Sequence, residues 1–262
     1  MRLICLALSV LATLSATASR VAAHEGPHPP QGYVALFNGE DLAGWHGMGH
    51  FDPYKLQEMS AEERAAKREA DTKNAHQHWS VENGELVNDG HGAYLTTDKN
   101  YKSFDLWLDY KTVAQADSGV YLRATPQVQI WDTTEAGGKW NIGAKEGSGC
   151  LWNNKKEGHR ALVHADKPFG EWNRMRITMT GEYVTVYLNG KLVVDHVPLD
   201  NFWRKDQPVI EEGPIQLQTH GGEIRWKNVY LREIPEAEAK QVNEQRAAEK
   251  EAGETPREIA TY

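Results

Sequence analysis

The feature that most constrains this chain is a period-two alternation of apolar and polar residues that runs from Gly32 onward. In "FDLWLDYKT" (104–112), Phe, Leu, Leu and Tyr share one face, and Asp, Trp, Asp and Lys share the other. Successive side chains of a β-strand point to opposite faces, so this pattern predicts strands with one buried face. "RMRITMT" (174–180) repeats the pattern, and "YVTVYLNGKLVVDH" (183–196) predicts two strands joined at Asn189-Gly190, a strong hairpin signal.

Shorter segments add further predicted strands, at residues 33–37, 78–82, 85–88 and 93–96, and two more on either side of Gly221-Gly222. Many short strands separated by Gly-rich turns are typical of an antiparallel sandwich. The sequence therefore predicts an all-β domain over residues 32–234.

Two segments depart from this pattern. "MSAEERAAKREADTKNA" (59–75) predicts a helix, because Ser60 and Glu63 have the spacing of a capping box. It interrupts the strand pattern, so we interpret it as a helical insertion at the surface. Residues 235–262 are highly charged and poor in aliphatic residues, which predicts either a solvated helix or a frayed tail.

The N-terminal residues predict export. Residues 1–23 combine Arg2, an apolar run and small residues before Ala23, as in a secretory signal peptide, and residues 24–31 form a linker. The apolar run is shorter than the ~20 residues of a membrane span, and no later segment could span a bilayer. We therefore expect a bacterial protein of the periplasm or the extracellular space, without a membrane span.

Charge and cysteine content exclude other classes. The net charge of −8 argues against nucleic acid or an anionic membrane as a partner. Cys150 is the only cysteine after residue 23, which excludes a disulfide framework. The sequence contains no dinucleotide-binding, phosphate-loop, serine-hydrolase or zinc-protease motif. No cofactor is predicted firmly; a divalent cation held by carboxylates and carbonyls stays open.

Paired amides mark two of the predicted strands. In "GPIQLQTH" (213–220), Ile215 and Leu217 face the interior, so Gln216, Gln218 and His220 share the other face. A plain solvent-facing strand is the alternative for this segment alone. However, amides donate and accept hydrogen bonds, which suits hydroxyl-rich ligands better than the Lys and Glu usual on surface strands.

The stretch "SGVYLRATPQVQIWD" (118–132) repeats the arrangement. We expect a hairpin that turns at Thr125-Pro126 and presents Gln127, Gln129 and Trp131 opposite its aliphatic residues. Two strands with paired amides predict one polar, concave sheet face that binds a carbohydrate. Trp152, beside two asparagines, is a candidate platform for stacking on a sugar ring.

Three further residues are candidates for catalysis. Arg123 carries a fixed charge and could hold a carbonyl or enolate oxygen, or else form a salt bridge with Asp117 or Asp132. Asp132 could be a general base, a metal ligand or the cap of the turn that follows it. His220 precedes a Gly-Gly turn at the end of a strand and is a candidate proton shuttle, although a lone histidine is more often structural.

Five segments together resemble the 3-keto-disaccharide hydrolase family, long described as a domain of unknown function (DUF1080). They are "YVALFNGEDLAGW", "WSVENGELV", "DSGVYLRATPQVQIWD", "GEWNRMRITMTGEYVTVYLNGKLVVD" and "GPIQLQTHGGEIRWKNVYLREI", in the family's order and spacing. The resemblance covers residues 32–234. It implies a concanavalin-like jelly-roll sandwich with a sugar-binding concave sheet, and an exported bacterial protein that acts on glycosides oxidised at C3.

One position departs from the family pattern. Many members carry an acidic residue where this chain has Gln127, and a neutral amide cannot act as a general acid or base. If that acidic residue is catalytic in the relatives, this chain would use Asp132, His220 or a bound metal, or would have a different or lost activity.

The chemistry that the resemblance implies explains the candidate groups. A ketone at C3 acidifies the hydrogen at C2; a base removes it, the glycosidic oxygen leaves C1, and water adds afterwards. Asp132 or His220 is then the base, Arg123 stabilises the enolate, and the glutamines position hydroxyl groups. Two alternatives remain: a carbohydrate-binding module without chemistry, and an extracellular structural or adhesion sandwich. Direct glycoside hydrolysis ranks lower, because no matched pair of carboxylates shares one face.

Overall fold

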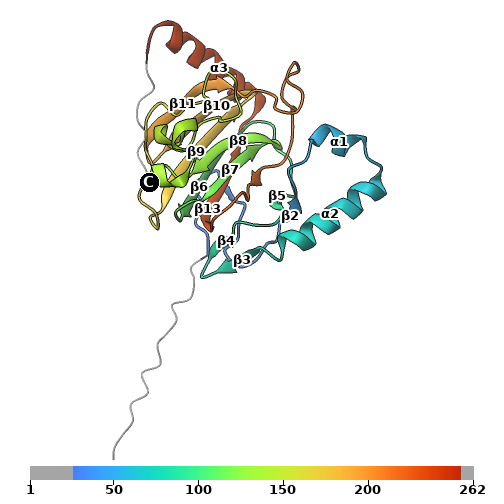
Figure 1. The fold of residues 1–262 in the computed structure, drawn as a ribbon. Helices are drawn as coiled ribbons and strands as arrows, with labels where there is room; N and C mark the ends of the chain where they lie inside the picture. Colours follow the sequence, from blue (N-terminus) through green and yellow to red (C-terminus); the bar gives the residue numbers. More distant parts are fainter. Residues whose placement is uncertain (1–25, 255–262) are drawn as a thin grey trace, which may run out of the picture.

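The computed structural model of the chain describes residues 26–254. The predicted signal peptide and residues 255–262 of the predicted tail lie outside the described residues. Two antiparallel sheets pack face to face, which confirms the predicted all-β sandwich (Figure 1). No helix within residues 26–254 is long and apolar enough to cross a membrane.

The larger sheet has eight strands in the order β11-β10-β9-β6-β13-β4-β3, and β1 pairs with β13 beyond the end of β4. Their bounds are β1 (Val34–Ala35), β3 (Trp79–Glu82), β4 (Glu85–Asn88), β6 (Phe104–Thr112), β9 (Asn173–Thr180), β10 (Tyr183–Leu188), β11 (Lys191–Pro198) and β13 (Ile224–Glu233).

The smaller sheet has five strands in the order β2-β5-β12-β7-β8. Their bounds are β2 (Trp45–Met48), β5 (Tyr94–Thr97), β7 (Asp117–Leu122), β8 (Thr125–Trp131) and β12 (Gln216–Leu217). The short strand β12 lies between β5 and β7, although it comes much later in the chain. This crossover carries the polar segment 216–220 into the centre of the smaller sheet.

The core lies between the two sheets and follows the predicted alternation. Leu106, Leu108 and Tyr110 of β6 are almost fully buried, as are Val120 and Ile130 of the facing sheet. Burying apolar surface of this kind is the main stabilising contribution to such a sandwich. The inward face of each strand is therefore committed to packing, and only the outward faces are available for chemistry.

Three helices lie outside the two sheets: α1 (Pro53–Glu58), α2 (Ala61–Ala75) and α3 (Glu236–Glu251). Helix α2 occupies the segment expected to be helical and begins with the expected capping box of Ser60 and Glu63. It packs beside β2 (Figure 1). The backbone of Gly47 in β2 meets that of Asp71 in α2 with no room for a side chain. The sequence patterns did not indicate α1.

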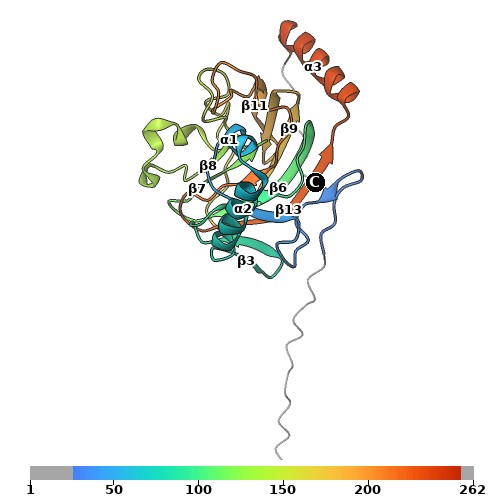
Figure 2. The same cartoon turned by 90° about the vertical axis from the view of Figure 1, so that its right-hand side faces the viewer.

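Helix α3 lies against the other end of the sandwich, away from α1 and α2 (Figures 1 and 2). Asn243 bonds to the backbone and side chain of Thr180, and Arg246 pairs with Asp195 at 2.7 Å. Part of the charged C-terminal segment is thus a helix docked on the sandwich. Polar contacts, rather than burial of an apolar helix face, hold α3 in place.

The hairpin of β7 and β8 turns two residues earlier than expected. Leu122 pairs with Thr125, so the turn consists of Arg123 and Ala124, and Thr125-Pro126 already belongs to β8. Arg123 and Ala124 both have positive φ angles, 54° and 56°. This is the conformation of a two-residue hairpin loop, which matches the twist of antiparallel strands. The expected Thr-Pro turn was therefore wrong.

Candidate functional site

The outward face of the five-stranded sheet gathers the predicted polar residues. Gln216 of β12 pairs with Thr96 on one side and with Tyr121 on the other, and the backbone of Gln218 donates to the carbonyl of Gly119 at 2.9 Å. Gly119 pairs with Gln129, so alternation along β8 places Gln127, Gln129 and Trp131 on the same face, although the pairing of β7 with β8 shifts register between Val120 and Leu122. The structure thus brings the paired amides of the two segments together.

Gly119 makes room for these amides. A Cβ atom at this position would lie 3.1 Å from Oε1 of Gln218 and 3.2 Å from Cδ of Gln127. It would also lie 2.8 Å from the carbonyl oxygen of Val128, which belongs to the backbone and cannot easily move. The glycine therefore lets two glutamine side chains lie directly over β7.

The amides form a buried hydrogen-bonded chain that ends on a carboxylate. Gln127 donates to Oε1 of Gln129, and Nε2 of Gln129 donates to Oδ1 of Asp117 at 2.7 Å. Both glutamines are less than a tenth exposed, as are Gln216 and Gln218. Buried polar groups are costly unless they are bonded, so this chain is a specific arrangement. Oε1 of Gln218, in contrast, has no hydrogen-bond partner within the described residues.

Asp117 also binds the predicted proton shuttle. Oδ2 of Asp117 accepts from Nδ1 of His220 at 2.8 Å, and the ammonium of Lys139 contacts the same carboxylate. The proton on Nδ1 leaves Nε2 of the neutral ring unprotonated. The His220 side chain is 57% exposed, whereas that of Asp117 is only 9% exposed. A reactive nitrogen at the solvent edge is thus held by a buried carboxylate, the arrangement expected of a general base.

The charge state of His220 suits this role. Desolvation lowers the pKa of His220, and the nearby charge of Lys139 lowers this pKa further. Partial burial also lowers the pKa of the Lys139 ammonium. The imidazole is therefore neutral, and able to accept a proton, over a wider pH range than a free histidine.

A close backbone approach brings His220 to Asp117. The backbone N–H of Asp117 donates to the carbonyl of Gly221 at 2.8 Å. Gly222 has a φ of 72°, and a Cβ there would lie 2.7 Å from Cα of Ala116. The Gly-Gly turn after His220 can therefore lie against the residue before β7, and no other residue type would fit as well.

A second histidine borders the same face. Nδ1 of His50 lies 3.0 Å from the hydroxyl of Tyr121, and its ring packs 4.6 Å from that of Trp203. Desolvation lowers the pKa of His50, and the charge of His220 lowers it further, so the two rings are close enough for their charges to interact. The sequence analysis did not identify four residues of this site: His50, Asp117, Lys139 and Tyr121.

Arg123 does not join this group, which corrects its predicted role. The turn at 123–124 sends its guanidinium away from the amides, where it donates to the carbonyls of Lys102 and Gly181, the latter at 2.6 Å, and of Ile210 at 3.3 Å. Arg123 pairs with neither Asp117 nor Asp132; burial lowers its pKa to about 10. The arginine fastens a hairpin turn to three backbone segments.

Asp132 caps a loop, and its hydrogen bonds go to Gln115 and Thr134 rather than to His220. Its Oδ2 accepts from the backbone of Gln115 at 2.7 Å, and its Oδ1 accepts from the backbone and hydroxyl of Thr134 at 2.8 and 2.6 Å. These bonds outweigh the opposing effect of burial and lower the pKa of Asp132. Of the alternatives open for Asp132, the structure supports the turn cap, because the carboxylate is occupied by its own loop.

The two predicted tryptophans pack against each other and against residues of the loop 133–160, to which Trp152 itself belongs. Trp131 shares the face of the glutamines but is buried, and its indole N–H donates to the carbonyl of Gly147 at 3.0 Å. Trp152 is half-buried; its ring stacks on His159 at 4.6 Å and meets the edge of Trp131 at 5.2 Å. Their contacts are those of packing residues rather than of an open platform for a sugar ring.

Metal ligands do not cluster in the described part of the chain. Among residues 26–254, no group of three or more His, Cys, Asp or Glu side chains could hold a metal ion. His78 pairs with Asp89 at 2.9 Å.

Two solved structures share the sandwich fold of this chain. A solved structure from Parabacteroides distasonis, provisionally described as a glycosyl hydrolase, aligns with a TM-score of 0.58 at 22% identity and covers 80% of this chain and 100% of its own. A second structure from that organism, described in the same way, aligns with a TM-score of 0.54 at 23% identity. It covers 77% of this chain and 99% of its own. At these identities the two structures show the fold.

Two sequence comparisons identify the family. A curated protein of Bacteroides thetaiotaomicron, named 3-keto-disaccharide hydrolase, is 20% identical over 79% of this chain and 80% of its own length. The model of the 3-keto-alpha-glucoside-1,2-lyase-like domain matches residues 32–232, which is most of the sandwich. The chain therefore belongs to the 3-keto-alpha-glucoside-1,2-lyase-like domain family.

Proposed function

We propose that this protein is an exported carbohydrate-active enzyme that cleaves 3-keto-glycosides by proton abstraction at C2. The observation that carries the proposal is the pair of His220 and Asp117, 2.8 Å apart, beside a floor of buried amides. Family membership supplies the substrate class, and the predicted signal peptide supports export.

In this proposal His220 is the general base. Its Nε2 takes the proton from C2, while Asp117 holds the ring in the correct tautomer and stabilises the imidazolium that forms. The electrons of the C2–H bond form the C1–C2 double bond through an enolate at O3, and the C1–O bond breaks. The leaving oxygen takes up a proton, and water then adds across the double bond, so that the sum is hydrolysis.

Lys139 takes the part that the sequence pattern suggested for Arg123. An ammonium beside the Asp117–His220 pair can stabilise the negative charge that develops on O3. Its lowered pKa also makes it a better proton donor than an exposed lysine. His50, on the other border of the same face, can bind a hydroxyl group of the substrate.

The glutamines bind and orient the sugar in this proposal. Oε1 of Gln218, buried and without a partner in the described chain, is an acceptor for a substrate hydroxyl. Substrate binding would satisfy this group, and an unoxidised sugar could satisfy it equally well. The ketone at C3 therefore selects the substrate through the chemical step, because only the ketone makes the C2 proton acidic.

The test is turnover of a chemically prepared 3-keto-disaccharide by the purified protein. Release of the second sugar by wild type, with its loss in His220→Ala and its retention in Asp132→Asn, is the expected result. Binding of unoxidised glycans without turnover of the 3-keto compound selects the binding-module alternative. Full turnover by His220→Ala contradicts the assignment of the base. Detection of the protein in the periplasm or medium of a bacterial host tests export.

A further inference from the structure

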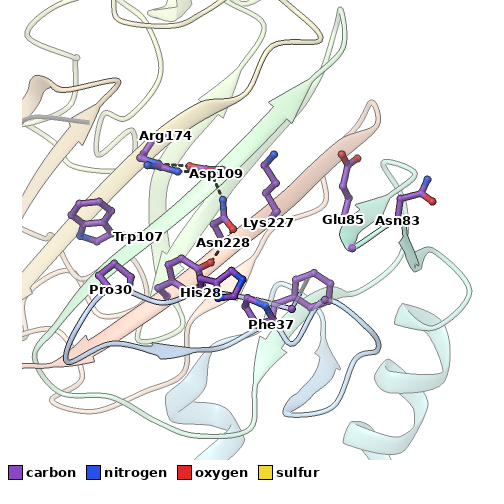
Figure 3. A pocket seen from close by; sticks show the side chains of 15 residues that line it. His28, Pro30, Phe37, Asn83, Glu85, Trp107, Asp109, Arg174, Lys227 and Asn228 are labelled. Carbon is purple, nitrogen blue, oxygen red and sulfur yellow. Dashed lines mark hydrogen bonds and ion pairs between the residues drawn. The ribbon is translucent and has the colours of Figure 1, made fainter. Parts of the chain in front are cut away.

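A polar cavity lies on the side of the sandwich opposite His220, on the outward face of the eight-stranded sheet (Figure 3). Its volume is ≈ 610 Å³, within the range of about 300–1,000 Å³ usual for small-ligand sites. Strands β4, β6, β9 and β13 line it, together with residues 26–30. The packed core separates this cavity from His220, so the two sites are independent.

A rigid polar network forms one wall of the cavity. Arg174 binds Asp109 in a bidentate pair, with Nε–Oδ1 at 2.7 Å and Nη2–Oδ2 at 2.9 Å. The amide of Asn228 donates to Asp109 at 2.7 Å and accepts from the hydroxyl of Tyr230 at 2.9 Å (Figure 3). The side chain of Asp109 is only 7% exposed, so solvent screens this network little.

A distortion of the sheet positions this network. The pairing of β13 with β6 shifts register between Lys227 and Tyr230, and Asn228 has a φ of 51°. A β-bulge of this kind re-aims a side chain, and bulges are frequent next to functional sites. At this bulge the amide of Asn228 is directed toward Asp109.

An aromatic side chain forms another part of the cavity. The half-buried indole of Trp107 lines it, held by the guanidinium of Arg176 at 5.4 Å from the ring centroid and by the edge of Tyr33 at 6.0 Å. Lys227 lies nearby with its ammonium 4.1 Å from the ring centroid of Trp172. The ring of Trp107 is covered by Arg176 and Tyr33 and offers no open face for stacking, but the exposed part of the half-buried side chain, beside amide and guanidinium groups, can contact C–H groups of a sugar whose hydroxyls form hydrogen bonds.

The charges around the cavity indicate a neutral ligand. Two carboxylates, Asp109 and Glu85, and two cations, Arg174 and Lys227, line the cavity, and Asp109 is paired with Arg174. Glu85 is also paired, with Arg225 at 3.2 Å. An anionic ligand would meet these two carboxylates, and a cation would meet the arginine and the lysine. A neutral, hydroxyl-rich molecule meets donors and acceptors without an unbalanced charge.

We propose that this cavity is a binding site for a neutral glycan, separate from the face that carries His220. Such a site would hold the protein on an unoxidised carbohydrate while the other face acts on its own substrate. This assignment does not depend on the proposed reaction, because the two faces share no residue.

The test is calorimetric titration of the purified protein with unoxidised maltose, cellobiose and trehalose as probes. We expect at least one probe to bind to wild type, to bind at least tenfold more weakly to Trp107→Ala, and to bind more weakly to the surface variant Lys227→Ala. His220→Ala is the matched control and should bind the same probe as wild type does. The folded state of each variant is checked by its thermal transition.

Turnover of the 3-keto-disaccharide, measured on the same variants, separates the two proposals. Trp107→Ala and Lys227→Ala should retain it, since they lie on the opposite face from His220. The glycan-site proposal is overturned by the absence of binding for all three probes. It is equally overturned by a probe that binds the folded variants Trp107→Ala and Lys227→Ala as tightly as wild type.

Discussion

Asp117 joins His220 to the buried amides, because one of its oxygens lies 2.8 Å from Nδ1 of His220 and the other accepts from Gln129 at 2.7 Å. The carboxylate thus fixes the orientation of the histidine and is itself fixed by the sheet. Positioned pairs of this kind are effective because little reorganisation is needed when the proton moves.

Asp117→Asn should lower kcat for the 3-keto-disaccharide by about 10²-fold or more, because an amide neither stabilises the imidazolium nor secures the tautomer. Steady-state kinetics measures this loss. Asp132→Asn is the matched control, since it removes a buried carboxylate from a loop cap; it should lower the melting temperature and leave kcat close to that of wild type. Equal kcat values for Asp117→Asn and wild type would contradict the proposed role.

The rate should depend on pH through His220. The base is active only when neutral, so kcat/KM should rise with pH and level off above the pKa of the free enzyme. Because desolvation and Lys139 lower that pKa, the rise should be centred below the value of ~6.5 for a free histidine. His50 and Asp117 also face His220 and contribute to the exact position. A pH–rate profile of wild type measures the midpoint, and a midpoint above that of a free histidine would contradict this assignment.

Lys139→Met should move this rise to higher pH, because it removes a positive charge that disfavours the imidazolium and frees Asp117 to stabilise it. It should also lower the plateau, since the enolate loses a cation. A pH–rate profile of the variant beside wild type measures both effects. A profile shifted to lower pH, or an unchanged plateau, would contradict the role proposed for Lys139.

Regular strands made part of this site predictable from sequence. A strand alternates its side chains without exception until a bulge or a turn occurs. This alternation predicted that four glutamines share one face: Gln127, Gln129, Gln216 and Gln218. His220 follows the last of these strands directly. The family was likewise recognisable, since its motifs lie on the strands and turns that build the sandwich.

The remainder of the site depends on irregular backbone, where alternation gives no information. Arg123 leaves the face because two consecutive residues adopt positive φ, and nothing in an Arg-Ala pair signals such a turn. Lys139 lies in a loop of short 3-10 turns, and Asn228 lies in a bulge. Asp117 could have been found, since it begins the strand next to the Gly-Gly turn, but its pairing with His220 is a contact distant in sequence.

Arg123→Asn should destabilise the fold by about 3 kcal/mol, because three carbonyl groups lose their donor inside the protein. Asparagine tolerates the positive φ of this position but is too short to replace the guanidinium. Ala124→Gly, in the same turn, is the matched control: relief of its positive φ and loss of its buried methyl group nearly cancel. Chemical denaturation gives both free energies of unfolding. Turnover by folded Arg123→Asn should equal that of wild type. A loss of kcat without loss of folding would show that Arg123 takes part in the reaction.

Gln127→Glu restores the acidic residue usual in the family and tests whether this chain depends on its absence. The introduced carboxyl group would be less than a tenth exposed and would face Oε1 of Gln129, an acceptor, in a network that already ends on Asp117. Burial and the neighbouring negative charge should raise the pKa of this carboxyl group above its value in the unfolded chain. Its neutral form is therefore the one compatible with folding, and the stability of the variant should fall as pH rises through that raised pKa.

Unfolding free energies at pH 5 and pH 8, compared with wild type, measure this difference, and Gln127→Ala separates the loss of the amide from the effect of charge. A variant that is as stable as wild type at pH 8 and turns over faster would show that the site can accommodate a second carboxylate and that His220 does not act alone.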